Sequence, residues 1–256
     1  MKLSILLPYK ENYSPAYPGA VSIFVHSMNK LSSYKKEIVV FGSTEYKKKL
    51  SINYININLS KKILSSNSKE YVLKFLAIHE KNNSDIIEIH NRPNYINKLT
   101  TLNSKIVLYF HNDPISMIGS KTVKERIYLL DICSKIIFNS EWSKKQYLKD
   151  LKNFYHKSKK LIVIHQSTNK VKVDIKKKKK LITFVGKLNS AKGYDIFGNA
   201  VLKILNKYPD WKAIVMGDEP REKLSFNHKN LKVLGFQNHE TVLKTFNSSS
   251  IAVACS

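Results

Sequence analysis

The chain has 256 residues, of which 43% are hydrophobic, so it is long enough for two ordinary domains and is not a disordered protein. Its 44 lysines and arginines against 19 acidic residues give a formal net charge of +25, which favours anionic partners such as phosphorylated substrates, acidic lipids or nucleic acid. The two cysteines, Cys133 and Cys255, lack metal-binding spacing and indicate a reducing compartment rather than a disulfide scaffold.

The amino-terminal segment MKLSILLP predicts a first strand rather than a signal peptide, because its apolar run is short and no small-residue cleavage site follows. No apolar run in the sequence approaches the length of a membrane span. Together with the cysteine usage, these features predict a cytoplasmic protein.

Strands and helices are expected to alternate along the first half of the chain. The predicted strands cover 3–7, 38–41, 52–57, 86–89, 106–110, 136–138 and 161–164. The predicted helices cover 20–31, 69–80, 123–132 and a segment that starts after the N-cap residue Ser140 and runs to about 151. This alternation predicts a parallel sheet with helices on both faces.

Polar residues follow three successive strands of this half, in the tripeptides His-Asn-Arg, His-Asn-Asp and Asn-Ser-Glu that begin at residues 90, 111 and 139. Ligands of open α/β sheets bind at the carboxyl edge of the strands, where these residues are expected to gather. Gly19 lies in the turn between the first strand and the first helix, where a simple helix cap is the alternative. The candidates for an acceptor-side cleft are Gly19, His90, Arg92, Asp113, Ser140 and Glu141.

Residues 168–180 are predicted to be a lysine-rich linker between a first domain at 1–167 and a second at 181–256. Five consecutive lysines, 176–180, end this linker. A block of like charge repels itself and is typical of a solvated loop, with contact to a membrane or a phosphate as the alternative.

The second half is predicted to contain four strands, at 181–185, 211–216, 231–234 and 251–254, joined by three helical crossovers. One predicted helix follows the first of these strands and ends near residue 207, before Pro209. Another covers about 240–246, with Asn238 or His239 near its start.

The stretch LITFVGKLNSAKG, at 181–193, combines a buried strand, a glycine turn with two lysines, and the start of a helix. Gly186 allows close approach of a ligand to the backbone, and the helix start offers N–H groups and a positive dipole end. Lys187 and Lys192 add two positive charges, so the stretch predicts a diphosphate site. It is neither a Walker loop nor a G-x-G-x-x-G turn, and two solvated lysines are the alternative interpretation.

The segments VGKLNSAKG, IVMGDEP and LGFQNHETVLKTFNSSSIAVACS resemble, in order and spacing, the second domain of family 4 (GT4) glycosyltransferases of the GT-B fold. FHNDP and FNSEWSKK resemble two segments of the first domain in that family. The resemblance implies an α/β fold of two Rossmann-like domains. The second domain is expected to be incomplete, because the family continues beyond the position of Ser256 with a segment that carries two carboxylates.

The resemblance also implies roles for particular residues. Gly186, Lys187, Lys192 and Gly193 would bind the donor diphosphate, and His111 would be the catalytic residue beside the transferred sugar. A histidine hydrogen-bonded near the sheet edge is the alternative for His111. Those expected near the donor base are Gly217, Asp218, Gly235, Phe236 and Gln237.

The function implied by the resemblance is that of a hexosyltransferase. It would move a sugar from a UDP- or GDP-linked donor to a hydroxyl acceptor with retention of configuration and without a metal or other cofactor. The absence of a DxD triplet agrees with the lack of a metal. The expected acceptor is a cell-envelope glycan or a lipid-linked saccharide, as in lipopolysaccharide synthesis. The basic chain would dock peripherally on the anionic inner face of the plasma membrane.

Two other functions are weighed against this one. A truncated, catalytically impaired remnant that acts as a binding module is favoured by the missing carboxylate segment. A basic nucleic-acid-binding protein is suggested by the net charge alone, because few of the basic residues are arginines and no helix-turn-helix, finger or RNA-binding aromatic pattern is present.

Overall fold

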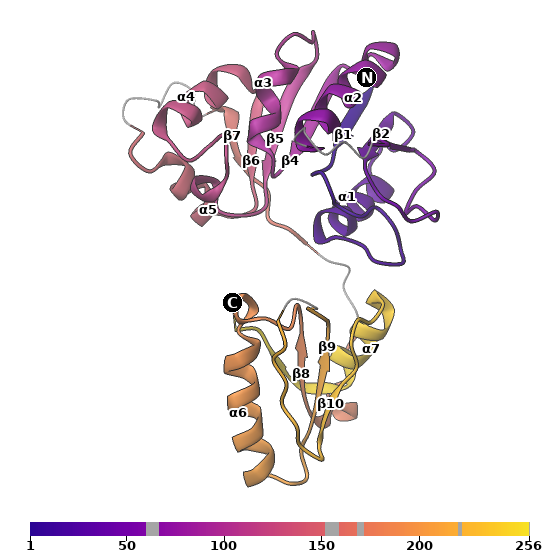
Figure 1. Cartoon of the computed structure of the whole chain (residues 1–256), viewed down its shortest axis with the longest axis vertical. Coiled ribbons are helices and arrows are strands. Elements are labelled where there is room, and N and C mark those ends of the chain that lie inside the picture. The colour runs from indigo at the N-terminus through magenta and orange to yellow at the C-terminus, as the bar shows by residue number, and fades with distance from the viewer. Residues whose placement is uncertain (60–66, 152–158, 168–171, 220–221, 256) are drawn as a thin grey trace. The chain divides into compact units, whose positions relative to one another are not determined.

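The computed structural model describes residues 1–59, 67–151, 159–167, 172–219 and 222–255 (Figure 1). The chain forms two compact units, Met1–Thr168 and Asn169–Ser256. Each unit has its own parallel sheet and its own hydrophobic core.

The first unit is built on a seven-stranded parallel sheet with strand order β3-β2-β1-β4-β5-β6-β7. Its strands are β1 (Leu3–Leu6), β2 (Ile38–Gly42), β3 (Tyr54–Asn56), β4 (Ile86–His90), β5 (Lys105–Phe110), β6 (Lys135–Phe138) and β7 (Leu161–Val163). All seven predicted strands are confirmed. The order reverses between β1 and β4, which is the switch point where open α/β sheets hold their ligands.

Helices cover this sheet in the alternation that the sequence predicts. They are α1 (Ala20–Leu31), α2 (Asn67–Asn82), α3 (Ile96–Leu99), α4 (Val123–Ile132) and α5 (Glu141–Leu148). The four-residue helix α3 was not predicted; it follows a 3-10 turn at Pro93–Tyr95. Helix α5 ends about three residues earlier than predicted, because Lys149 leaves the helical region and Asp150 has a φ of 64°.

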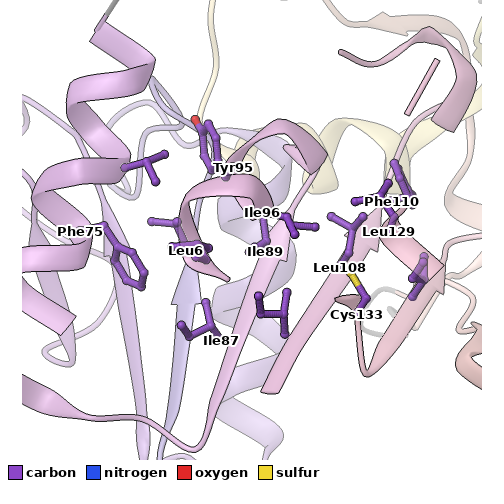
Figure 2. Close-up of a cluster of buried hydrophobic side chains, with 14 of the residues drawn as sticks. Leu6, Phe75, Ile87, Ile89, Tyr95, Ile96, Leu108, Phe110, Leu129 and Cys133 are labelled. Atoms are coloured by element: carbon purple, nitrogen blue, oxygen red, sulfur yellow. The ribbon is translucent and has the colours of Figure 1, made fainter. Parts of the chain in front are cut away.

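The two faces of the first sheet are both buried, which explains why its strands are mostly apolar. In β1, Leu6 belongs to one core cluster, and Ile5 with the following Leu7 belongs to the opposite one. Figure 2 shows the larger cluster, where Leu6, Ile87 and Leu108 meet side chains from the covering helices. Cys133 is part of this cluster as a free thiol, and burial raises its pKa to about 12, so it is an apolar core residue at neutral pH.

The second unit contains a four-stranded parallel sheet with strand order β10-β9-β8-β11. Its elements are β8 (Lys179–Val185), α6 (Tyr194–Lys207), β9 (Lys212–Met216), β10 (Leu231–Val233), α7 (His239–Ser248) and β11 (Ser249–Val253). Its order reverses between β8 and β11, so the carboxyl end of β8 lies at a switch point. Its main core cluster joins β8 and β9 to the apolar face of α6.

Two expectations for the second unit are wrong. The linker was predicted to extend to residue 180, but Lys179 and Lys180 already belong to β8. The start of this strand is set by backbone pairing with β11, and the charge of the two side chains does not prevent it. The linker residues 168–171 lie outside the described residues, and the remaining part includes an exposed 3-10 turn at Ile175–Lys177.

The connection from β9 to β10 was predicted to be a helical crossover, but its described residues, 217–219 and 222–230, contain no helix. Leu224 and Phe226 on this extended connection pack against the core cluster of the second unit. A Cβ atom on Gly198 of α6 would lie 2.2 Å from the Phe226 ring, so the connection runs directly over this helix. Apolar contacts of an extended segment therefore replace the expected helix.

None of the helices within the described residues has the length and hydrophobicity needed to span a bilayer.

Candidate functional site

The glycine turn after β8 lies where the carboxyl ends of β8 and β9 approach each other closely. Gly186 N donates to Met216 O at 3.0 Å, and Gly217 N donates to Gly235 O at 2.8 Å. Gly217 has a φ of 141°, and a Cβ atom there would lie 1.7 Å from Gly186 O. Glycine is therefore required at Gly217 for these two strand ends to meet.

The residues after Gly186 form a tight, internally bonded turn that leads into α6. Asn189 Oδ1 accepts from Lys192 N at 3.1 Å, and Asn189 O accepts from Tyr194 N at 3.1 Å. Gly193 adopts the left-handed conformation with a φ of 66°, and a Cβ atom there would lie 2.4 Å from Cys255 Cβ. The turn thus touches the chain that follows β11, on the other side of the switch point.

The predicted diphosphate-binding residues surround the amino end of α6. Lys187 and Lys192 are both exposed, and Gly193 is the N-cap residue of the helix. As a glycine, Gly193 supplies no side-chain cap to this 14-residue helix, and Asp195 is the acidic residue of its first turn. The two lysines and the positive dipole end of the helix together offer positive potential at this turn.

A carboxylate of the same chain already contacts this turn. Glu222 Oε2 accepts from Ser190 N at 3.0 Å and lies 3.2 Å from Ser190 Oγ. An N–H group that binds a carboxylate oxygen can bind a phosphate oxygen in the same way. Sequence inspection missed Glu222 because it lies 32 residues away, on the irregular β9–β10 connection.

The residues expected near the donor base lie at the same sheet edge. Gly217 and Gly235 are joined by the backbone hydrogen bond given above, and Asp218 O accepts from Leu188 N at 3.4 Å. Gln237 Nε2 donates to Leu234 O at 2.8 Å, which fixes the loop after β10, and Phe236 beside it is 39% exposed. The structure therefore brings together the strand ends that carry this prediction, and donor contact itself stays a prediction.

In the first unit, two asparagines join the ends of β4, β5 and β6 around His111. His111 N donates to Asn91 Oδ1 at 2.7 Å, and Asn139 Nδ2 donates to His111 O at 2.7 Å. Sequence inspection did not single out either asparagine for a role of its own, although each belongs to a polar tripeptide at a strand end.

The imidazole of His111 sits in a stack of rings. It lies parallel to Tyr109 at a centroid distance of 4.5 Å, and Phe24 of α1 meets it edge-on at 5.2 Å. His90 Nδ1 is 2.7 Å from His111 Nε2. Burial, together with the neighbouring His90, lowers the pKa of His111 to about 3, so its ring is neutral at pH 7.

The other candidate residues of the first unit have contacts within the unit. His90 is fully buried and faces His111 rather than solvent. Arg92 Nη1 donates to Asn91 O at 2.7 Å. Asp113 caps the 3-10 turn at Pro114–Ser116, and the predicted N-cap role of Ser140 on α5 is confirmed by its bond from Ser143 N at 3.1 Å. Glu141 is exposed in the first turn of α5.

Gly19 precedes α1, as predicted, but this helix start already holds an acidic side chain. Glu11 Oε1 accepts from Ser22 N at 2.9 Å, and a Cβ atom on Gly19 would lie 1.9 Å from the same oxygen. Glu11 therefore fills the position that an external anion would take.

No group of three or more histidine, cysteine, aspartate or glutamate side chains in the described residues is arranged to hold a metal ion.

Comparison with solved structures defines the class of fold. HepE of Anabaena, in complex with UDP-glucose, superposes with a TM-score of 0.74 at 14% identity, over 100% of this chain and 74% of that one. Sucrose-phosphate synthase of Thermosynechococcus elongatus gives 0.70 at 13% identity, over 98% and 75% of the two chains. The lipopolysaccharide outer core galactosyltransferase WaaB gives 0.60 at 13% identity, over 100% and 74%. The chain thus has the α/β GT-B glycosyltransferase fold.

The sequence of the second unit also matches a known family. Residues 165–256 match the family model described as Glycosyl transferases group 1. Comparison of the whole chain with curated protein sequences finds no match.

Proposed function

We propose that this chain is a hexosyltransferase that moves a sugar from a nucleotide-sugar to a hydroxyl acceptor, with retention of configuration and without a metal ion or other cofactor. The observation that carries this proposal is the glycine turn with Lys187 and Lys192 at a sheet switch point, inside the segment that matches group 1 glycosyl transferases. UDP is favoured over GDP as the carrier, because HepE and two other similar structures are described as complexes with UDP or UDP-glucose.

In the proposed reaction, negative charge grows on the departing diphosphate. The bond between the sugar and the diphosphate breaks, and the diphosphate keeps the electron pair. The oxygen of the acceptor hydroxyl bonds to the sugar, and its proton passes to an oxygen of the departing diphosphate. Lys187, Lys192 and the amino end of α6 would stabilise the charge that grows on the leaving diphosphate. Ser190 N would be available to a phosphate oxygen once Glu222 moves away.

The acceptor is proposed to be a cell-envelope glycan or a lipid-linked saccharide, met by a cytoplasmic protein at an anionic membrane surface. The net charge of +25 supports such docking. A cavity of about 450 Å³ at the amino-terminal edge of the second sheet, opposite the glycine turn, is lined by five lysines: Lys179, Lys180, Lys212, Lys229 and Lys232. Sedimentation with phosphatidylglycerol vesicles, but not with phosphatidylcholine vesicles, is the expected result. Equal recovery with both would refute membrane docking.

The nucleotide-sugar proposal is tested by calorimetric titration with UDP-glucose. Lys192→Ala and Lys187→Ala are each expected to weaken binding by about tenfold, which corresponds to about 1.4 kcal/mol for the loss of one charge contact. Lys203→Ala, an exposed lysine further along α6, is the matched control and should bind as the unchanged chain does. Equal affinities for Lys192→Ala and Lys203→Ala would refute the diphosphate role.

A binding module without catalysis is the second candidate, and the contact of Glu222 with the turn favours it, because a carboxylate already occupies Ser190 N. It predicts adhesion to phosphatidylglycerol vesicles without binding of UDP-glucose. Release of UDP from UDP-glucose in the presence of sugar acceptors would exclude this candidate.

A further inference from the structure

Four side chains of the first unit form a continuous series of polar contacts, which we call the histidine relay: Glu88, His90, His111 and Gln166. Glu88 Oε1 lies 2.8 Å from His90 Nε2. His90 Nδ1 lies 2.7 Å from His111 Nε2, and the side-chain amide of Gln166 contacts His111 Nδ1. The relay runs from a carboxylate on β4, through two rings, to an exposed residue after β7.

The carboxylate at one end determines where each proton of the relay lies. An ionised carboxylate only accepts, so a neutral His90 carries its proton on Nε2, although the Glu88 oxygen lies off the direction of a straight hydrogen bond. The opposite tautomer would set two lone pairs 2.8 Å apart. His90 Nδ1 is then an acceptor, and the proton between the rings must belong to His111 Nε2.

The outer nitrogen of His111 is consequently a bare acceptor. Its present partner is the amide nitrogen of Gln166, a donor, which agrees with this assignment at the far end of the relay. Gln166 is exposed, so a ligand can replace its amide without disturbing the buried rings.

We propose that Glu88 is a positioning residue that acts through His90 and holds His111 with its proton on Nε2, so that Nδ1 accepts a hydrogen bond from a substrate hydroxyl in place of Gln166. The role in substrate binding rests on the proposed glycosyl transfer, whereas the proton positions do not. A phosphate or carbonyl oxygen would be repelled by this lone pair, so the ligand class is a hydroxyl-bearing sugar group.

The surroundings of the relay hold the rings in this arrangement. Tyr109 lies parallel to both imidazoles, with centroid distances of 5.4 Å to His90 and 4.5 Å to His111. Its hydroxyl donates to Ile164 O at 3.1 Å and so does not compete for either ring. Phe24 of α1 meets both imidazole rings edge-on. Among the described contacts, the charged group that faces the two histidine rings is Glu88. The lowered pKa of His111 keeps its ring neutral at pH 7.

The test is nuclear magnetic resonance of the full chain with nitrogen-15 in its histidines, because the ring-nitrogen shifts distinguish the two neutral tautomers. His90→Gln and His111→Gln assign the two sets of signals. At pH 7 both histidines are expected to show protonated Nε2 and bare Nδ1. Glu88→Gln is expected to shift the signals of both rings towards a mixture of tautomers.

The matched control is Glu37→Gln, the same substitution at an exposed position before β2, which should leave the signals unchanged. Unchanged signals of His26 and His79 in the Glu88→Gln chain show that the first unit is folded. A proton on His111 Nδ1 in the unchanged chain, or tautomers that do not respond to Glu88→Gln, would overturn the inference.

The hydroxyl contact is tested in the same sample by adding free glucose, which is expected to shift the His111 Nδ1 signal. A signal that stays in place throughout the titration refutes the hydroxyl contact. If UDP-glucose does not bind in calorimetry, the proposed function fails instead, and the response to Glu88→Gln still decides whether Glu88 sets the protons of the relay.

Discussion

The close approach of β8 and β9 makes a quantitative prediction for Gly217→Ala, with Gly235→Ala as its matched comparison. Both glycines have positive φ, 141° and 67° respectively. The new methyl group at Gly235 meets no atom within 4 Å, so its cost is that of the left-handed conformation, about 1–2 kcal/mol.

The cost at Gly217 has two parts. Its backbone conformation is unfavourable for any other residue, at about 1–3 kcal/mol. The methyl group would also lie 1.7 Å from Gly186 O, so the strand ends must separate and strain the bonds from Gly186 N to Met216 O and from Gly217 N to Gly235 O. Each such bond contributes about 1 kcal/mol. The two backbone costs are similar, so Gly217→Ala should destabilise the second unit by about 2 kcal/mol more than Gly235→Ala, which corresponds to the two weakened bonds.

The assay is urea unfolding followed by tryptophan fluorescence. The chain has two tryptophans, Trp142 in α5 and the half-buried Trp211 beside the core of the second unit. In a Trp142→Phe background, Trp211 alone reports the second unit. Equal or smaller destabilisation by Gly217→Ala than by Gly235→Ala would refute the reasoning about the strand ends.

Three further predictions concern single contacts. Glu222→Gln removes a negative charge at Ser190 and should tighten UDP-glucose binding about threefold to tenfold by calorimetry, through reduced repulsion; weaker binding would contradict an anion site. Thr122→Ala removes the capping box of α4 and should lower the free energy of unfolding in urea by about 1 kcal/mol. An unchanged free energy of unfolding would contradict a stabilising role of this cap. Because the pKa of His111 falls from 6.5 to about 3 on folding, the unfolded chain binds more protons between these values, so stability should fall as pH falls from about 6.5 to about 3. His111→Gln should reduce this slope in acid-unfolding measurements, and an unchanged slope would count against the burial of a neutral ring.

The parts of the structure that follow from local sequence could be predicted. Strands that are buried on both faces have largely apolar sequences, as in residues 106–110. N-cap residues such as Ser140 and Asn238 mark the starts of the helices that follow them. The turn from Gly186 to Gly193 was also recognisable, because Gly193 adopts the left-handed conformation and approaches Cys255 too closely for a side chain.

The partners of the candidate site residues could not be predicted in either unit, because most of them meet their contacts only through the folded chain. Glu11 reaches the start of α1 from 11 residues before Ser22, Glu222 reaches Ser190 across 32 residues, and Gln166 reaches His111 across 55. Glu88 alone is close in sequence to its partner, two residues from His90 on the same face of β4. The sequence signal for this contact was a glutamate two residues before a histidine within a central, otherwise apolar strand.

The carboxylate of Glu11 has a consequence for what the first unit can recognise. It is tethered beside the amino end of α1, and a group on a short tether has an effective concentration on the order of millimolar. A free phosphate that approaches this helix must compete with the Glu11 carboxylate for the same N–H groups, so a weakly binding anion is not expected to occupy this helix start. After β5, by contrast, the outer nitrogen of the His111 ring contacts the neutral amide of Gln166. We therefore expect the first unit to discriminate against charged ligands and to favour neutral ones, and we expect the lysine turn of the second unit to favour anions.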